Sequence, residues 1–192
     1  MAVHNLGLNA LARRSLASLI VGAALLGVPQ AIAVQFSDGT RHFAAVPRLV
    51  KVSTTQNQAH TWGGRYYITV SVPEDASEPL GKLEIRQDEG SDRLGPFEFD
   101  RTLAFVEGDR QRSVQVEWVE LDRDRQTIAV AFNPPIPPGK TLTLGLVPVR
   151  TPDAGIYLWG ITAFPAGEKV ASQFLGYGRL HFYDDRDRSF WR

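Results

Sequence analysis

The sequence of 192 residues contains no cysteine, and its only methionine is Met1. Without cysteine, the chain forms no disulfide, thiolate metal site or iron–sulfur cluster, and it has no cysteine nucleophile. An excess of one charge is also lacking, because 21 Lys and Arg residues balance 21 Asp and Glu residues. Nucleic-acid-binding domains carry surplus Lys and Arg. The composition therefore argues against a nucleic-acid partner.

Motifs of common enzymes and cofactor sites are missing as well. The sequence has no Gly-x-Ser-x-Gly elbow, no phosphate-binding loop and no dinucleotide-binding glycine pattern. Glu98 and Asp100 could form a carboxylate pair of the glycosidase type. They flank Phe99 in an alternating run, however, which indicates the polar face of a β-strand. We predict that the protein is not an enzyme and that it binds no cofactor.

Long hydrophobic runs are lacking too, apart from one near the N-terminus. Residues 16–28 are apolar and uncharged, they follow Arg13 and Arg14, and a small-x-small cleavage site (Ala-Ile-Ala) occupies residues 31–33. The apolar run, of about 13 residues, is short for crossing a bilayer. We predict that residues 1–33 are a cleaved signal peptide rather than a retained anchor. Arg13 and Arg14 also resemble a twin-arginine signal, but the surrounding residues match it poorly, so we favour general secretion over the twin-arginine route. No membrane span is expected after cleavage.

Alternating apolar and polar side chains are the main signal in the rest of the chain. This period of two predicts half-buried β-strands. It recurs in residues 66–72, 83–86, 114–118, 127–132 and 141–146. Two later segments, residues 156–164 and 174–183, are apolar on both faces. They are expected to be central strands covered on both sides, or strands at an interface.

Turn signals and prolines separate these runs. Residues 133–139 contain four prolines, so this segment must be extended and must bridge two sheets or follow an edge. One short turn fits within residues 73–80, and no longer helical period is found. We predict a single all-β domain over residues 34–183, an antiparallel β-sandwich of immunoglobulin-like or Greek-key outline, with a closed β-barrel as the alternative. The charged residues 184–192 are predicted to be a disordered tail.

Two groups of residues are weak candidates for metal binding. Asp88, Glu89 and Asp92 surround Gly90 and could supply carboxylate oxygens to Ca²⁺ on a tight turn. The competing interpretation is a solvated charged loop. The histidines of the predicted mature chain are not spaced as paired ligands, so any zinc or copper site would have to be assembled by folding. They are His42, His60 and His181.

Aromatic residues are more numerous than one face of a sheet needs. In the segment 156–164, Tyr157 and Trp159 share a face, and Ile156 and Leu158 share the opposite one. Flat aromatic side chains on an exposed sheet stack on sugar rings or form protein interfaces. Burial in the core is the competing interpretation. Tyr157 and Trp159 are therefore the first candidates for an exposed ligand-binding patch.

The second half of the chain resembles a known family in the order and spacing of four segments. They begin with Phe-Asn-Pro-Pro-Ile-Pro-Pro-Gly at residues 132–139 and continue in residues 144–150, 155–168 and 173–183. Residues 36–40 and 73–80 also fit. This pattern resembles the uncharacterised exported proteins of cyanobacteria grouped as domain of unknown function 2808. The resemblance implies a protein of the periplasm or the cell exterior, or of the thylakoid lumen. It implies no activity.

The sequence leaves three functions open. The leading expectation is an exported, non-catalytic β-sandwich that binds a protein or polysaccharide of the cell envelope or lumen. The second is a carbohydrate-binding module that uses Tyr157 and Trp159. The third, a metal protein or hydrolase, requires the histidines to converge with a carboxylate.

Overall fold

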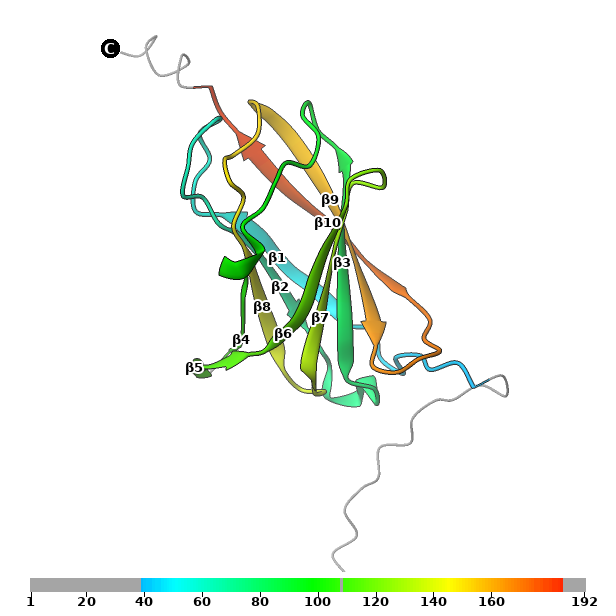
Figure 1. Cartoon of the computed structure of the whole chain (residues 1–192). Coiled ribbons are helices and arrows are strands. Elements are labelled where there is room, and N and C mark those ends of the chain that lie inside the picture. Colours follow the sequence, from blue (N-terminus) through cyan, green and yellow to red (C-terminus); the bar gives the residue numbers. More distant parts are fainter. Residues whose placement is uncertain (1–38, 108, 185–192) are drawn as a thin grey trace, which may run out of the picture. The chain divides into compact units, whose positions relative to one another are not determined.

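The computed structural model describes residues 39–107 and 109–184 (Figure 1). The predicted signal peptide, residues 1–33, lies outside the described residues, and so does all of the predicted tail except Asp184. Both therefore stay predictions. In the described part of the chain, no helix has the length and hydropathy needed to span a bilayer.

Within the described residues, ten strands form two antiparallel sheets of five strands each. The first sheet has the order β1 (Arg48–Thr54), β2 (Tyr66–Ser71), β8 (Thr141–Leu146), β4 (Leu103–Val106) and β5 (Asp109–Val114). The second has the order β10 (Gln173–Phe182), β9 (Gly155–Pro165), β3 (Leu80–Glu89), β7 (Thr127–Ile136) and β6 (Val116–Asp122). Among these ten strands, no ladder joins one sheet to the other. The predicted β-sandwich is confirmed, and the alternative of a closed barrel is wrong.

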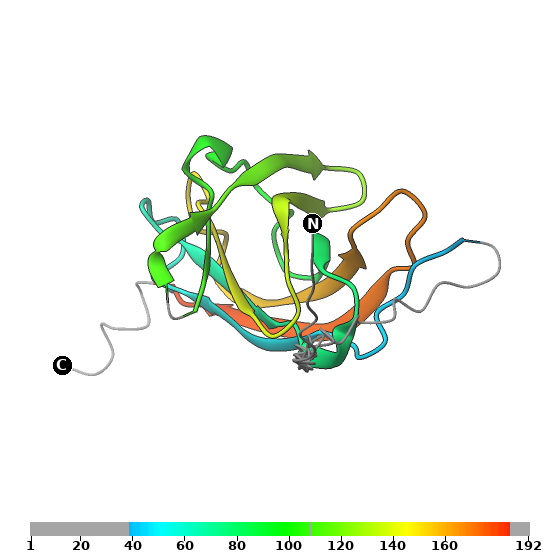
Figure 2. The same ribbon diagram turned by 90° about the horizontal axis from the view of Figure 1, so that it is seen from below.

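The core lies between the two sheets, which face each other across a shared interior (Figure 2). On β2 the predicted alternation is confirmed, because Tyr66, Ile68 and Val70 are each at most 3% exposed and the residues between them are half-buried. The facing sheet contributes Leu83 and Ile85 from β3. Each fully buried side chain of this size contributes roughly 1.5–3 kcal/mol relative to an exposed one. The core thus supplies the stability that disulfides cannot.

The turns and connections are partly as expected. A 3₁₀ turn, η1 (Glu74–Ala76), forms in the segment where one short turn was expected. The proline-rich run continues β7 through a cis peptide bond between Asn133 and Pro134 and leads to β8 in the other sheet. Its predicted role as a bridge between sheets is confirmed. The expected strand around Glu98 and Asp100 is wrong, because the chain there forms a second 3₁₀ turn, η2 (Phe99–Arg101).

The two segments that are apolar on both faces have different positions. β9 is a central strand between β10 and β3, as predicted. β10 is the last strand of its sheet, and Phe174 and Tyr177 are about half exposed, at 47% and 56%. The expectation of a central strand covered on both sides is wrong for β10, and its alternative, a strand at an interface, stays a prediction. The apolar outer side chains of β10 therefore belong to the surface of the second sheet.

Candidate functional site

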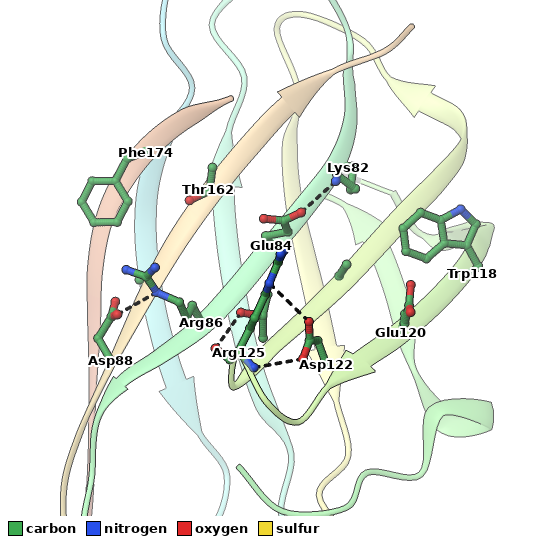
Figure 3. A pocket seen from close by; sticks show the side chains of 13 residues that line it. Lys82, Glu84, Arg86, Asp88, Trp118, Glu120, Asp122, Arg125, Thr162 and Phe174 are labelled. Carbon is green, nitrogen blue, oxygen red and sulfur yellow. Dashed lines mark hydrogen bonds and ion pairs between the residues drawn. The ribbon is translucent and has the colours of Figure 1, made fainter. Parts of the chain in front are cut away.

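The candidate site is a hollow of about 730 Å³ on the outer face of the second sheet (Figure 3). Residues from every strand of that sheet line it, together with Arg125 in the turn between β6 and β7. The lining side chains are Lys82, Glu84, Arg86, Asp88, Trp118, Glu120, Asp122, Arg125, Thr127, Ala129, Gly160, Thr162 and Phe174. We call this surface the outer hollow.

A row of charged side chains on β3 runs through the middle of the outer hollow. Successive strand residues point to opposite faces. Leu83 and Ile85 therefore enter the core, while Lys82, Glu84 and Arg86 point outward (Figure 3). The charges alternate in sign along the strand. β3 therefore presents charged side chains to solvent on one face and apolar side chains to the core on the other.

Neighbouring groups in this row are paired with each other. Lys82 Nζ lies 2.8 Å from Glu84 Oε1 and 3.9 Å from the ring centre of Phe164. Arg86 Nε lies 2.7 Å from Asp88 Oδ1 (Figure 3). These pairs are partly exposed, so they add little to stability. Their remaining donors and acceptors stay available for hydrogen bonds to a ligand.

The strands on each side of β3 carry small outward side chains. In the sheet register, Glu84 stands between Ala129 of β7 and Thr162 of β9, and Arg86 stands between Thr127 and Gly160. A Cβ on Gly160 would approach Asp88 Oδ2 to 2.6 Å and Phe174 Cε2 to 3.3 Å. Small residues therefore flank the charged row on both sides, and at Gly160 the side chains of Asp88 and Phe174 occupy the space that a Cβ would need.

Aromatic side chains stand at the two margins of the outer hollow. Trp118 of β6 is 42% exposed, and Phe174 at the start of β10 is 47% exposed (Figure 3). The Phe174 ring packs edge to face on Tyr177 with their centres 5.1 Å apart. Exposed aromatic side chains on a rigid sheet are able to form contacts with ligands or partners.

The margin at β6 also carries carboxylates. Glu120 and Asp122 follow Trp118 on the same face, because they are the next alternate residues of the strand. Asp122 Oδ1 accepts hydrogen bonds from the backbone N–H groups of Asp124 and Arg125, at 3.0 and 2.9 Å. This fixes the turn that closes one end of the outer hollow. Its lining as a whole has three basic and four acidic side chains, so it is nearly neutral.

The sequence pattern predicted the wrong face of the sheet for Trp118. Simple alternation places Val114, Val116 and Trp118 on one face. In the structure, β5 ends at Val114 in the first sheet, β6 begins at Val116 in the second, and the pairing of β6 with β7 shifts between Val116 and Trp118. A bulge adds one residue and reverses the facing of the residues beyond it. Val116 therefore packs on the core, whereas Trp118 faces solvent.

The expected exposed patch at Tyr157 and Trp159 is wrong. Both residues are buried, at 1% and 3% exposure, and belong to the core. Tyr66 packs edge to face on Trp159, at 5.1 Å between ring centres, and Tyr157 packs on Phe182 at 5.6 Å. The Tyr157 hydroxyl donates to the Asp153 carbonyl oxygen at 2.9 Å. Burial raises the pKa of the Tyr157 phenol above its usual value of 10.0.

The sequence did not decide the facing of β9. The face opposite Tyr157 and Trp159 carries Gly160 and Thr162, but also Ile156, Leu158 and Phe164. The face of Tyr157 and Trp159 continues with Ile161 and Ala163. Both faces are largely apolar, so the packing of the two sheets decides which one is buried.

The expected metal sites are not formed. Among the described residues, no three His, Asp or Glu side chains are placed to hold a metal ion. Asp88 pairs with Arg86, and Glu89 is exposed, so Asp88, Glu89 and Asp92 do not form the expected Ca²⁺ loop. His60 Nε2 lies 3.3 Å from Asp153 Oδ1, and the His181 ring packs on Tyr183. These two histidines and His42 do not converge on one centre within the described chain.

The fold and the outer hollow define an all-β sandwich with an open, mixed aromatic and charged surface. Residues 40–182 match a family described as "Protein of unknown function (DUF2808)". The chain belongs to this family, as the resemblance in its second half indicated. No curated protein sequence matches the chain significantly.

Several solved structures resemble the fold at low sequence identity. One is BslA, described as a bacterial hydrophobin, with a TM-score of 0.41 and 13% identity over 73% of this chain and 95% of that one. Another is the collagen-binding domain of a Staphylococcus aureus adhesin, with a TM-score of 0.37 and 9% identity over 70% and 97%. A third is AvmM, with a TM-score of 0.40 and 13% identity over 79% and 96%.

Proposed function

We propose that this protein is an exported, non-catalytic binding module for a macromolecule of the cell envelope or lumen. We further propose that the outer hollow is its binding surface. One observation carries the proposal: Trp118 and Phe174 lie exposed at opposite margins of a concave face whose strands are held by a fully buried core. A rigid sheet presents such side chains with little loss of entropy on binding.

The polar groups of the outer hollow favour binding over catalysis. A general acid or base must reach the reacting group and must be free to exchange its proton. In the outer hollow, six of the charged side chains form ion pairs with each other. The pairs are Lys82 with Glu84, Arg86 with Asp88, and Arg125 with Asp122, whose Oδ2 lies 3.6 Å from Arg125 Nε. Within the part of the chain that the structure describes, no three His, Asp or Glu side chains are placed to hold a metal ion. The metal site of the third expectation therefore has no support there.

Export belongs to the same proposal. It is supported by the charged start, the apolar run and the small-x-small site within residues 1–33. The resemblance to exported cyanobacterial proteins adds the source and the choice between periplasm, cell exterior and thylakoid lumen. Expression with a C-terminal tag, followed by fractionation and N-terminal sequencing, tests this part. A mature N-terminus near Val34 in an exported fraction is the expected result.

Binding through the outer hollow is tested with a pair of matched substitutions. Thr162→Arg places a long side chain in the outer hollow, and Thr69→Arg places the same side chain on the outer face of the first sheet, where Thr69 pairs with Thr143 at 3.1 Å. The protein is produced from the full chain in an exporting host. It is titrated with separated protein and polysaccharide fractions of the cell envelope of the organism from which the sequence comes. Saturable binding that Thr162→Arg weakens and Thr69→Arg leaves intact is the expected result. Equal effects of the two variants would contradict the assignment.

A further inference from the structure

We infer that the occupant of the outer hollow is a neutral polysaccharide that lies across the strands from Trp118 to Phe174. This inference rests on the proposed binding function and names its ligand class. Its starting point is the position of the two aromatic residues. They lie on β6 and β10, the first and last strands of the sheet. Four spacings between strands, or about 19 Å, separate them.

The width of this gap suits a chain ligand better than a small molecule. Phe174 pairs in register with Thr162, in the row that joins Thr162, Glu84 and Ala129. Trp118 pairs with Ala131, two residues along β7 from Ala129. The two aromatic residues therefore lie at opposite edges of the sheet with an offset of about 7 Å along the strands. A small ring can contact only one of them, whereas an oligosaccharide can contact both and bridge the polar middle.

The polar middle provides the contacts that hydroxyl groups need. Glu84 and Lys82 lie between the two rings, and Glu120 lies beside Trp118 (Figure 3). A carboxylate accepts several hydrogen bonds, and an ammonium group donates three. Sugar hydroxyls both donate and accept, so they fit a row that alternates acceptors and donors. The apolar faces of the sugar rings stack on Trp118 and Phe174, because flat aromatic side chains combine a large apolar face with low entropy cost.

The charge balance excludes strongly charged ligands. Three basic and four acidic side chains line the outer hollow. Polyanions are bound by surplus Lys and Arg, and polycations by surplus carboxylates. Neither surplus exists here, and six of the seven charged groups already have an opposite charge within 4 Å. A neutral ligand can use their spare lone pairs and protons without breaking these pairs.

A protein partner is less well matched to the same surface. The centres of protein interfaces are depleted of Lys, Glu and Asp. The middle of the outer hollow is instead a row of Lys82, Glu84, Arg86 and Asp88, with aromatic groups only at the margins. A flat protein surface would have to desolvate this whole row. A narrow chain with hydroxyls on its edges leaves much of the row in water.

The test uses the full chain from an exporting host and calorimetric titration with defined probes. Neutral hexasaccharides of glucose, galactose, mannose and xylose, in α and β linkage, are compared with a hexauronate and with a chitosan hexamer. We expect a neutral hexasaccharide to bind saturably, and its disaccharide to bind about tenfold more weakly or worse, because it reaches one ring only. Trp118→Ala and Phe174→Ala should each weaken hexasaccharide binding by about tenfold.

Trp62→Ala is the matched control. Trp62 is 69% exposed but does not line the outer hollow. This variant should bind like the wild type. The variants Trp118→Ala and Phe174→Ala remove half-exposed side chains, and unchanged melting temperatures will show that they fold.

The remaining outcomes separate the inference from the proposed function. One outcome is that no neutral sugar binds, while the hexauronate, the chitosan hexamer or an envelope protein binds and this binding is lost in Trp118→Ala. That outcome overturns the proposed ligand class but supports the outer hollow as the binding surface. Neutral binding that persists in the double variant Trp118→Ala, Phe174→Ala overturns the inference as well. If no probe and no envelope fraction binds through this face, both proposals fail.

Discussion

Gly178 of β10 lies directly against Val52 of β1, so that a Cβ at Gly178 would overlap the Val52 side chain. These residues belong to the outermost strands of the two different sheets. The contact therefore seals one side of the sandwich without a hydrogen-bonded ladder. It also places the edge of β10 against protein instead of water, which protects an edge strand from pairing with other chains.

This contact predicts that Gly178→Ala is strongly destabilising. The added methyl group has no room, and overpacking of this kind costs about 1–3 kcal/mol or more. Gly95→Ala is the control, because nothing lies within 4 Å of its Cβ position. Urea unfolding of both variants measures the difference. A Gly178→Ala variant as stable as Gly95→Ala would show that the two strands are not in contact.

A second prediction separates the buried tryptophan from the exposed one. Trp159→Ala removes a side chain at 3% exposure and should cost about 3–5 kcal/mol of stability, whereas Trp118→Ala should cost less than about 1 kcal/mol. Trp159→Phe should be milder than Trp159→Ala, since it keeps an aromatic ring and removes a buried Nε1 with no hydrogen-bond partner in the described chain. Chemical unfolding measures all three. Equal losses for Trp159→Ala and Trp118→Ala would contradict the assignment of the core.

Trp159 and Trp118 show which features of the structure the sequence pattern predicts and which it does not. Alternation predicted the strands and the sandwich, because each strand must bury one face. It could not decide which face of residues 156–164 is buried, because both faces are largely apolar. It also could not show the bulge that turns Trp118 outward. The outer hollow depends on register between strands far apart in the chain, such as Glu84 with Thr162. Such pairings are set by tertiary packing and are not visible in any one segment.

A third prediction concerns alkaline pH. Burial, with a smaller contribution from Tyr157, raises the pKa of the Tyr66 phenol well above its usual value of 10.0. The unfolded chain therefore releases this proton near pH 10, while the folded protein keeps it. The contribution of the Tyr66 phenol to the free energy of unfolding is therefore complete below pH 10. It decreases by up to about 1.4 kcal/mol per pH unit as the pH rises above 10.

The measurement is urea unfolding of the wild type and Tyr66→Phe at pH 9 and pH 11. Tyr66→Phe lacks the phenol, so its stability should fall less between these two pH values. Tyr177→Phe removes an exposed phenol and should fall as much as the wild type. Parallel losses in the wild type and Tyr66→Phe would rule out Tyr66 as a source of alkaline instability.

The last prediction concerns Gly160, which supports the Phe174 margin of the outer hollow. A Cβ at this position would lie 2.6 Å from Asp88 Oδ2, 3.3 Å from Phe174 Cε2 and 3.4 Å from Tyr177 Cε1. Each of these atoms is at the end of a side chain on the protein surface, so Gly160→Ala should move them at a cost of about 1 kcal/mol or less. The fold should survive, but the carboxylate of Asp88 and the ring of Phe174 should shift away from β9.

This shift has a consequence that a purely structural glycine would not have. If a neutral oligosaccharide stacks on Phe174, Gly160→Ala should weaken hexasaccharide binding several-fold. It should leave disaccharide binding at Trp118 unchanged, because that margin lies across the sheet. Gly176→Ala is a poor control because of its positive φ of 122°, whereas Gly95→Ala adds a methyl group in open space. Loss of hexasaccharide binding in Gly160→Ala, with retention in Gly95→Ala, would show that Gly160 positions the ring. Equal binding by both variants would mean that Phe174 contributes no stacking surface.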